Sequence, residues 1–537
     1  MDHNYLNYPY ASSQMTKFSQ KGMVATSQPL AAQAGLDILK KGGNAVDAAI
    51  ATAACLTVVE PTSNGIGGDA FSIVWMKDEI YGLNASGPSP KNISINEVKE
   101  RGFNKMPKRG WIPVTVPGAP SAWVKLSERF GNLSLEEVLE PAINYAKEGY
   151  PLSPVLSKNW KKAYHEFENE LTKEHFSNWF ETFTIDGNPP NCGDVWKSKD
   201  HADTLQKIAK TKGKAFYKGE LAEKIDRFSR KYDGFLRKED LSAYSPEWIK
   251  PLSVKYREYD VWELPPNGQG LVALMALNIL KNFTFKSKER VETYHKQIEA
   301  LKLAFIDGKK YITDPKNMKV SIEKLLSQEY AMNRKKMINN KQAIKPNPIE
   351  FNKSGTVYLS TADKEGNMVS FIQSNYMGFG SGLVVPNTGI ALQNRGHSFS
   401  LNKKDHNSLA PNKKPYHTII PGFLTKNKKP IGPFGVMGGY MQPQGHIQVL
   451  MNLIDFALNP QTALDAPRWQ WIKNKEILVE SDFPNHIAKE LARKGHKIKL
   501  KLDSGNFGRG QIILKDSKRK IYIGGTEKRT DGHIAVW

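Results

Sequence analysis

The order of apolar and polar positions predicts two helices near the N-terminus. Across residues 28–41, apolar side chains recur at helical spacing, and the pair Gly42–Gly43 follows as a helix stop. Asn44 offers an N-cap for a second helix, Ala45–Thr57, which is apolar on nearly every side. Because such a helix has no polar face to turn to water, we expect it to be buried and to end before Pro61.

Strands are predicted where short apolar runs are bounded by turn-forming residues. Ala70–Trp75 and Ile80–Leu83 form one expected pair. Thr356–Ala362 and Met368–Ser374 flank Asp363–Asn367, a stretch whose composition and length suit a turn. This second segment is the clearest strand signal in the chain, and we expect it to form a hairpin.

The remaining segments differ in composition and in the spacing of their apolar residues. Residues 150–310 read as mostly helical, and Ser134 with Glu137 forms a capping box for a helix before them. Asn267–Gly270 lacks the lysine of a phosphate-binding loop and is expected to be a turn. Residues 333–355 are rich in Lys, Asn and Pro and are expected to be an exposed linker. Helices, then a linker, then a β-rich last third indicate an α+β fold with helices segregated from an antiparallel sheet.

Composition narrows the class of protein. The 537 residues are 39% hydrophobic and 24% charged, which is typical of a globular chain. No apolar run is long enough to cross a bilayer, and Met1–Gly22 does not resemble a secretory signal, so no membrane role is expected. The net charge is +22, but the lysines are spread and no nucleic-acid-binding motif accompanies them, so no nucleic-acid partner is expected. Two cysteines, Cys55 and Cys192, favour a reducing, cytoplasmic setting over a disulfide or zinc scaffold.

The residues at the junction between the linker and the hairpin could cleave their own peptide bond. Gly355 ends the linker and Thr356 opens a strand. The threonine hydroxyl could attack the Gly355 carbonyl, shift the acyl group from nitrogen to oxygen, and let water release it. The new N-terminal threonine would carry an α-amine whose ordinary pKa of about 7.7–8.0 suits a general base near neutrality. A Gly-Thr pair also begins ordinary strands, so the residues alone leave both interpretations open.

Seven short stretches rich in Gly, Asn, Asp and Pro occur along the chain. They are Gly42–Ala49, Glu60–Asp69, Val116–Gly118, Thr356–Tyr358 with Asp363 and Gly366–Asn367, Pro386–Asn394, Met437–His446 and Asn459–Arg468. Together they resemble the γ-glutamyltransferase family (glutathione hydrolases). The matches run in the family's order from about Gly22 to Gly532, so the resemblance covers nearly the whole chain.

The resemblance implies an N-terminal-nucleophile hydrolase with a four-layer αββα sandwich, made as one precursor and self-cleaved. It implies that Thr356 becomes the nucleophile after scission at Gly355, and that the backbone N–H groups of Gly438–Gly439 form the oxyanion hole. Residues 1–355 and 356–537 would be the two subunits of one structural domain, and two such pairs would form a dimer. The resemblance implies neither a metal nor a cofactor.

The chain departs from the family in the residues that bind the acyl group. The family arginine that binds the α-carboxylate corresponds to Ser86 here, and residues 84–90 contain no arginine. The family's carboxamide and carboxylate that hold the α-amine correspond to Arg395 and Ser398, its serine pair to His417–Thr418, and its threonine and asparagine after the hairpin to Ser374 and Tyr376.

These substitutions change the expected charge preference. We expect the substrate-binding residues to be Ser374, Tyr376, Arg395, His417 and Thr418, although the larger side chains among them also fit packing roles. A site that loses an acidic amine ligand and gains Arg395 should favour an acyl group with a carboxylate and no neighbouring ammonium. The pattern resembles the divergent branch that includes cephalosporin acylase-like proteins and an oxamate amidohydrolase.

Three functions stay open at this point. The first is a γ-glutamyltransferase or glutathione hydrolase that cleaves a γ-glutamyl amide. The second is an amidohydrolase or acylase for another carboxylated acyl group, glutaryl- or oxamate-like. The third is a non-enzymatic basic binding protein on an inactive hydrolase fold. That third function would need the loss of Thr356 or of the Gly438–Gly439 pair, and both are present.

Overall fold

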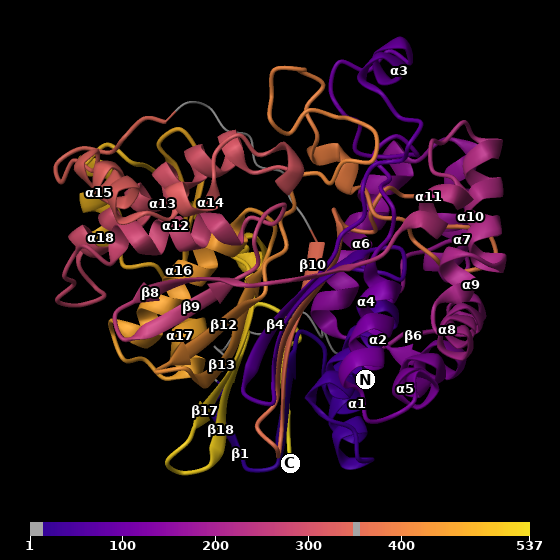
Figure 1. Ribbon diagram of the computed structural model, residues 1–537, viewed down its shortest axis with the longest axis horizontal. Coiled ribbons are helices and arrows are strands. Elements are labelled where there is room, and N and C mark those ends of the chain that lie inside the picture. The colour runs from indigo at the N-terminus through magenta and orange to yellow at the C-terminus, as the bar shows by residue number, and fades with distance from the viewer. Residues whose placement is uncertain (1–13, 347–354) are drawn as a thin grey trace.

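Two seven-stranded sheets form the centre of the computed structural model, which describes residues 14–346 and 355–537 (Figure 1). Neighbouring strands are antiparallel throughout both sheets. The first sheet has the order β1 (Lys17–Ser19), β18 (Ile521–Thr526), β17 (Arg509–Asp516), β13 (Lys429–Met437), β12 (Gly422–Lys426), β9 (Tyr259–Glu263) and β8 (Leu252–Tyr256). The second has the order β19 (His533–Val536), β2 (Gly22–Thr26), β10 (Gly355–Asp363), β11 (Met368–Tyr376), β3 (Asp69–Met76), β4 (Glu79–Ala85) and β7 (Glu247–Ile249).

Helices surround these sheets, and two small sheets lie outside them. The helices of the first half are α1 (Pro29–Lys40), α2 (Ala45–Val59), α3 (Ile95–Glu100), α4 (Ala119–Phe130), α5 (Leu135–Glu148), α6 (Pro154–Glu170), α7 (Ser177–Phe183), α8 (Lys199–Thr211), α9 (Lys214–Tyr217), α10 (Glu220–Lys231) and α11 (Lys238–Ala243). Those of the second half are α12 (Gly270–Leu280), α13 (Val291–Tyr311), α14 (Ile322–Leu325), α15 (Gln328–Lys336), α16 (Met441–Ile454), α17 (Pro460–Asp465) and α18 (Asn485–Arg493). The small sheets pair β14 (Trp469–Lys473), β15 (Glu476–Glu480) and β16 (Lys497–Lys501), and β5 (Tyr150–Pro151) with β6 (Val195–Trp196).

The two large sheets pack face to face through an apolar core. Phe71 and Ile372 from one sheet and Ile513 from the other belong to the same buried cluster. The rings of Trp75 and Phe423 stack across this layer with centroids 6.1 Å apart. Helices α1, α2 and α4 cover the outer face of the second sheet, and α12 and α16 cover the first, on opposite sides of Figure 1. Burial of these apolar faces is the main force that holds the sheets in place.

Each sheet contains strands from both sides of the predicted linker. The predicted hairpin β10–β11 lies in the middle of its sheet, with β2 on one side and β3 on the other. Leu359 pairs with Thr26, and Ser374 pairs with Asp69. The expected segregation of helices before strands is therefore wrong, because β2, β3, β4, β8 and β9 precede the linker and still complete both sheets.

Most of the predicted elements are confirmed. Asn44 caps α2 in a capping box with Asp47, and all residues of α2 are buried. Ser134 and Glu137 form the expected capping box of α5. The predicted linker begins too early, because α15 extends through Lys336 from a cap at Ser327. Of that linker, residues 347–354 lie outside the described part of the chain.

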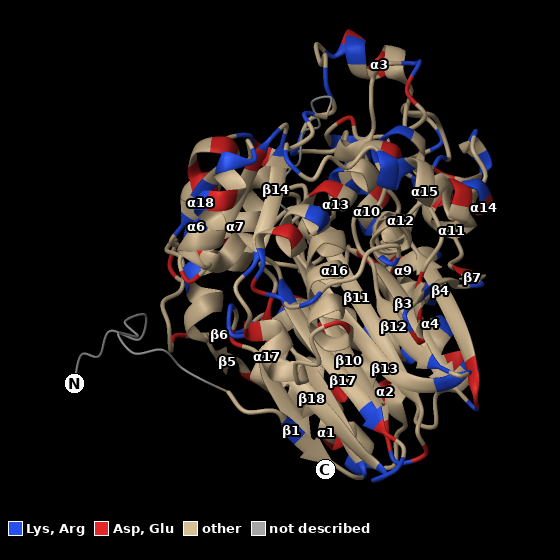
Figure 2. Cartoon of the chain, turned by 90° about the vertical axis from the view of Figure 1, so that its left-hand side faces the viewer, with Lys and Arg blue, Asp and Glu red and all other residues tan. Residues whose placement is uncertain are grey.

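The surface carries both signs of charge. On the face shown in Figure 2, basic and acidic residues alternate over the helices without a broad area of one sign. Among the described helices, none combines the length and the apolar character that a membrane span requires.

One aspartate ties the hairpin turn to the buried helix. Asp363 Oδ2 accepts hydrogen bonds from the Ala45 backbone N–H and from Asn367 Nδ2, each at 2.9 Å. Asp363 Oδ1 accepts from the backbone N–H groups of Glu365 and Asn367, each at 3.0 Å. The turn of β10–β11 and the first turn of α2 are thus held by one carboxylate, which fixes where the hairpin begins and ends relative to the helix.

We predict that Asp363→Ala lowers the free energy of unfolding by about 1–3 kcal/mol, because it leaves buried N–H donors without an acceptor. Urea unfolding followed by tryptophan fluorescence would measure the shift in midpoint. Asp516→Ala is the matched control, since Asp516 accepts only from Lys518 and Arg519 in the exposed β17–β18 turn. Equal midpoints for the two variants would contradict the anchoring role of Asp363.

Candidate active site

A bulge in the β10–β11 pairing sits at the predicted nucleophile. Gly355 pairs with Tyr376 and Val357 pairs with Gln373, so Ser374 and Asn375 together face Thr356. Bulges bend a strand and change the direction of its side chains, and they are common beside active sites. Tyr376 has a φ of +73°, in the left-handed region that non-glycine residues rarely occupy.

Two hydroxyl groups converge on the carbonyl of the predicted cleavage site. Thr356 Oγ1 lies 2.8 Å from the Gly355 carbonyl oxygen and 3.2 Å from Ser374 Oγ. The Ser374 hydroxyl donates to the same carbonyl oxygen at 2.8 Å. A hydroxyl that donates to a carbonyl oxygen withdraws electron density from the carbon and favours attack on it. Thr356 and Ser374 are both fully or almost fully buried, so water competes little for these contacts.

The space around Gly355 explains the absence of a side chain there. A Cβ atom at this position would lie 3.1 Å from Ser63 Cα and 3.1 Å from the Thr62 carbonyl oxygen, both backbone atoms. Contacts this short are tighter than most real Cβ contacts, and a side chain here would require the neighbouring backbone to shift by a few tenths of an ångström. The glycine therefore allows the chain to pass close to the loop that follows α2.

Arg395 lies beside the predicted nucleophile, and no carboxylate of the described residues forms a hydrogen bond or ion pair with it. Its side chain is fully buried, Nη1 donates to Thr418 Oγ1 at 2.7 Å, and Nη2 donates to Ser374 Oγ at 3.4 Å. Its guanidinium carbon stands 4.1 Å from the centre of the Tyr376 ring. Within the described residues, Nε has no hydrogen-bond partner. Burial lowers the pKa of Arg395 to about 10, which leaves the guanidinium charged at neutral pH.

The residues at the positions that correspond to the family's acyl-group ligands have two kinds of contact. Thr418 and Tyr376 contact the Arg395 guanidinium directly, as just described. Ser398 instead donates its hydroxyl to the carbonyl oxygens of Arg395 and Tyr416, each at 2.9 Å. It therefore stabilises the backbone of the loop that carries Arg395. Ser86 donates to Asn84 Oδ1 at 2.7 Å and is fully buried beside Asn267. A hydroxyl thus lies at the position to which the family resemblance assigns the arginine that binds the α-carboxylate.

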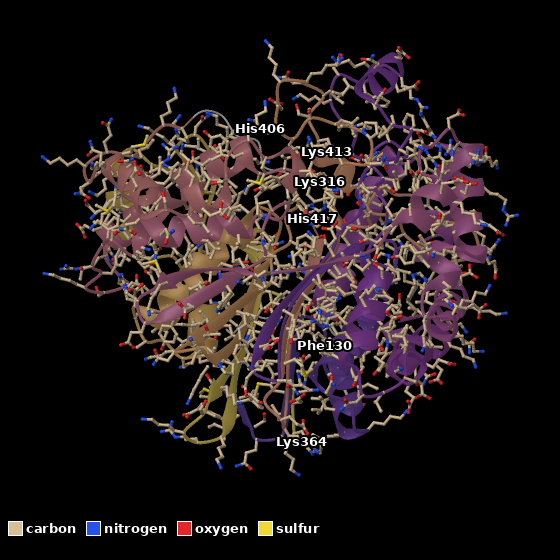
Figure 3. The ribbon with its side chains drawn as sticks, viewed as in Figure 1. Phe130, Lys316, Lys364, His406, Lys413 and His417 are labelled. Carbon is tan, nitrogen blue, oxygen red and sulfur yellow. The ribbon has the colours of Figure 1, made fainter. Side chains whose placement is uncertain are left out.

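His417 is held by an aspartate that the sequence did not single out. His417 Nε2 donates to Asp69 Oδ2 at 3.0 Å, and Nδ1 accepts from the Ile419 backbone N–H at 3.3 Å. Burial and the nearby Arg395 charge lower the pKa of His417, so the imidazole is neutral. Both ring nitrogens are therefore engaged, and the ring packs on Phe71 with centroids 4.8 Å apart. Figure 3 shows His417 near the centre of the molecule, and its side chain is fully buried.

The glycine pair has the backbone that its predicted role requires. Gly438 and Gly439 lie between β13 and α16, with φ values of +133° and +63° that favour glycine. Neither N–H group donates to another described residue, so both are free to donate to a ligand. N–H groups at the start of a helix favour negative charge, and here they precede α16.

A buried glutamine connects the glycine pair to the arginine. Gln269 Nε2 donates to the carbonyl oxygens of Thr418 and Gly439, at 2.6 Å and 2.8 Å. Asn267–Gly270 is a turn, as predicted, yet its Gln269 side chain also bridges two parts of the site. No motif marks this glutamine, because its partners are backbone atoms about 150 residues away along the chain.

A second cation lies in the same region and was also missed. Lys309, in the last turn of α13, donates to the Tyr440 hydroxyl at 2.6 Å and sits 4.0 Å from the centre of that ring. Burial lowers the pKa of Lys309 to about 8. A lysine in the last turn of a helix is usually a solvent-facing residue that favours the helix dipole, so the sequence offered no signal.

One group of potential metal ligands occurs among the described residues, away from Thr356. His295, Glu299 and His496 have ligand atoms within 4.8 Å of one another. Lys302 Nζ lies 2.7 Å from Glu299 Oε1 and 3.5 Å from His496 Nδ1. The ammonium of Lys302 thus supplies the positive charge that this buried group requires.

We predict that Ser374→Ala slows cleavage at Gly355–Thr356 by about 10²-fold, the usual cost of removing one donor to a developing oxyanion. Freshly synthesised chain would be followed on denaturing gels as one band becomes two. Ser370→Ala is the matched control, because Ser370 lies on the same strand, is fully buried and contacts Tyr358 instead. Parental cleavage rates in both variants would exclude Ser374 from the reaction.

Comparison with known proteins agrees with this geometry. The γ-glutamyltranspeptidase family model matches residues 31–537. The glutathione hydrolase-like YwrD proenzyme of Bacillus subtilis is 36% identical, over 95% of this chain and 98% of its own. The oxamate amidohydrolase proenzyme of Klebsiella pneumoniae is 31% identical, over 96% and 98%.

A solved structure has a higher sequence identity to this chain than these two relatives. The cephalosporin acylase from Bacillus halodurans has 60% sequence identity and a TM-score of 0.97, covering 100% of this chain and 99% of its own. The resemblance noted in the sequence and the mixed helix-and-sheet fold are both confirmed. The match over almost the full length shows that the chain belongs to the γ-glutamyltranspeptidase family of enzymes.

Proposed function

We propose that the chain is a self-processing amidohydrolase that uses an N-terminal threonine to cleave γ-glutamyl or related carboxylated amides. The precursor would be cut between Gly355 and Thr356 into subunits of residues 1–355 and 356–537. Each large sheet contains strands from both sides of this junction, which supports one structural domain that survives the cut. Relatives of the chain are named as proenzymes, in agreement with this reading.

Processing would proceed in two balanced steps. Thr356 Oγ1 attacks the Gly355 carbonyl carbon, the C–N bond breaks, and the hydroxyl proton passes to the nitrogen, which leaves an ester and a free α-amine. Water then hydrolyses the ester, so that Gly355 ends in a carboxylate and Thr356 regains its hydroxyl. The hydroxyl contacts at 2.8 Å from the carbonyl oxygen support this assignment.

Turnover would repeat the same chemistry on a substrate. The α-amine of Thr356 acts as general base, the hydroxyl forms an acyl-enzyme, and the amine of the substrate leaves. The N–H groups of Gly438 and Gly439 would stabilise the oxyanion. Water, or an acceptor amine in a transfer reaction, then releases the acyl group. The role of these residues requires neither a metal nor a cofactor.

One observation supports a carboxylated acyl group. Arg395 is buried 3.4 Å from Ser374 Oγ, and among the described residues its guanidinium contacts two hydroxyl groups and an aromatic ring but no carboxylate. Burying a charge without a counter-ion is costly, so the site gains stability when an anion binds. A γ-glutamyl donor and a donor without an α-amine both supply this carboxylate, and family membership favours testing the γ-glutamyl group first.

The proposal includes the four-layer αββα arrangement of N-terminal-nucleophile hydrolases. The packing of α2 on one sheet, α16 on the other, and the sheets on each other supports it. A dimer of processed pairs and a reducing, cytoplasmic setting also belong to the proposal. The reducing, cytoplasmic setting agrees with the two unpaired cysteines, Cys55 and Cys192.

We predict that Thr356→Ala gives a single uncut chain with no amidase activity, because one hydroxyl serves both scission and turnover. Thr356→Ser should be cut and active, although more slowly. Denaturing gels and release of product from a γ-glutamyl or other carboxylated amide would be measured together. Two fragments from the alanine variant would rule out Thr356 as the nucleophile.

We predict that Arg395→Gln lowers kcat/KM for anionic donors by the equivalent of about 2–5 kcal/mol, since the substrate carboxylate is left unpaired. Self-cleavage should continue, because the Gly355 carbonyl requires Thr356 and oxyanion donors but no cation. Arg230→Gln is the control for net charge, as Arg230 is exposed on α10 and pairs with Asp226. Unchanged hydrolysis of every anionic donor by processed Arg395→Gln enzyme would remove Arg395 from the acyl site.

A further inference from the structure

The turn that carries Gln269 is hydrogen-bonded along its backbone to residues 415–418. The Gln269 N–H donates to the His417 carbonyl oxygen at 3.0 Å, and the His417 N–H donates to the Asn267 carbonyl oxygen at 2.9 Å. Asn267 Nδ2 also donates to the Pro415 carbonyl oxygen at 2.8 Å. These contacts hold the base of the Gln269 side chain in a fixed position relative to that segment.

Each polar atom of the Gln269 side chain has a hydrogen-bond partner. The side chain is fully buried, Nε2 donates to the carbonyl oxygens of Thr418 and Gly439, and Oε1 accepts from the Tyr416 hydroxyl at 3.0 Å. Two carbonyl oxygens can be matched only by the amide nitrogen, so these partners fix the orientation of the carboxamide. Because a buried polar group without a partner costs free energy, the carboxamide is held in this one position.

The contact with Gly439 restrains the proposed oxyanion hole. The Gly439 carbonyl oxygen accepts from Gln269 and, at 3.1 Å, from the Gln442 N–H in the first turn of α16. Glycine has more backbone freedom than other residues, and Gly438 and Gly439 both have positive φ values. A carbonyl held by two donors restricts rotation of Gly439, and with it the direction of the N–H groups that would stabilise an oxyanion.

The contact with Thr418 restrains the arginine of the proposed acyl site. Thr418 Oγ1 accepts from Arg395 Nη1 at 2.7 Å, and the Thr418 carbonyl oxygen accepts from Gln269 Nε2 at 2.6 Å. Together with the contact to Gly439, these hydrogen bonds form one continuous series from the guanidinium to the glycine pair. The series fixes the position of Arg395 relative to the proposed oxyanion hole.

We infer that Gln269 is a positioning residue for the reaction, which couples binding of the acyl carboxylate at Arg395 to alignment of the scissile carbonyl in the oxyanion hole. It acts through Thr418 and Gly439, because its side-chain hydrogen bonds go to protein groups. A misplacement of about 1 Å at a reacting centre can lower a rate by about 10²-fold. The inference rests on the proposed function and adds a residue that determines how precisely a bound donor meets the N–H groups.

Gln269→Met tests this inference, because methionine has a similar length but lacks the amide donors and the acceptor. The probe is a γ-glutamyl or glutaryl anilide, whichever the processed parental enzyme hydrolyses faster. We expect kcat to fall by about tenfold to a hundredfold and KM to change by less than about threefold, since Arg395 keeps its contact with Thr418. Parental kcat in fully processed Gln269→Met enzyme would overturn the inference.

Self-cleavage separates positioning from a general loss of structure. The Gly355 carbonyl oxygen accepts from the hydroxyl groups of Thr356 and Ser374, so the Gln269→Met precursor should be cut at the parental rate. Denaturing gels of freshly synthesised chain would measure this rate. Equal falls in the rates of self-cleavage and turnover would assign Gln269 a structural role only and overturn the inference.

Gln448→Met is the matched control. Gln448 is buried on α16, its Nε2 donates to two carbonyl oxygens, and its Oε1 accepts from the Trp469 N–H, so it forms the same set of hydrogen bonds. We expect this variant to lower Tm about as much as Gln269→Met does and to keep the parental kcat. Equal falls in kcat for the two variants would contradict a positioning role for Gln269.

A double-variant cycle tests the coupling itself. In Arg395→Gln the acyl carboxylate is no longer held, so the alignment that Gln269 provides has less effect. We expect Gln269→Met to lower kcat/KM by a factor at least about threefold smaller in this background than in the parental enzyme. Fold-changes that multiply would show that the two residues act independently and would contradict the coupling.

Tyr416→Phe gives a second variant that keeps the packing of the site. It removes the hydroxyl that donates to Gln269 Oε1, so kcat should fall by about threefold to tenfold while self-cleavage keeps its parental rate. If Gln269→Met yields no processed enzyme, a parental kcat in Tyr416→Phe would overturn the inference.

Failure of the proposed function would be seen in the parental chain. A parental precursor that is not cut, or a processed parental enzyme that hydrolyses neither anilide, would overturn the proposed function and the inference with it. An active parental enzyme whose kcat is insensitive to Gln269→Met would overturn only the role of Gln269 and leave the proposed function intact.

Discussion

Where β10 meets β11, the single residue Thr356 faces two residues, Ser374 and Asn375. The site is organised around this bulge. It brings the Ser374 hydroxyl onto the Gly355 carbonyl oxygen, and it is followed by Tyr376 in a left-handed conformation that carries the ring beneath Arg395. A regular pairing would direct Ser374 elsewhere, because a shift of one residue turns each side chain to the opposite face. The flanking strands β2 and β3 hold the hairpin so that this irregular geometry persists.

The second constraint is the buried charge of Arg395. Hydroxyl groups and the face of the Tyr376 ring stabilise this charge in part. The Asp69 carboxylate accepts a hydrogen bond from His417 instead of pairing with Arg395. A direct Asp–Arg pair would neutralise the guanidinium and leave little reason for an anion to bind. The indirect arrangement leaves the positive charge of Arg395 beside Thr356, which supports the proposed preference for carboxylated acyl groups.

The site is assembled from segments that are distant in the chain but share the two sheets. Asp69 begins β3, Gln269 precedes α12, Arg395 lies in the loop after β11, and Gly438–Gly439 join β13 to α16. Strands from both sides of the Gly355–Thr356 junction form both sheets, so a cut there removes one covalent bond and leaves the hydrogen-bonded framework intact. This arrangement allows a precursor to be processed without dismantling its active site.

The sequence by itself determined the local elements and indicated the candidate reactive residues. Helical spacing and caps predicted α1 and α2, turn residues predicted β10–β11, and ordered motifs indicated Thr356, the glycine pair and Arg395, since each depends on neighbours close in the chain. The tertiary structure decided the strand order of the sheets and the long-range contacts of the site, which those local signals do not encode. The strands before the linker join both sheets, His417 is fixed by Asp69, Gln269 bridges Thr418 and Gly439, and Lys309 turns inward onto Tyr440. These features depend on burial and on partners between 131 and 348 residues apart in the chain, and neither can be read from a local pattern of residues.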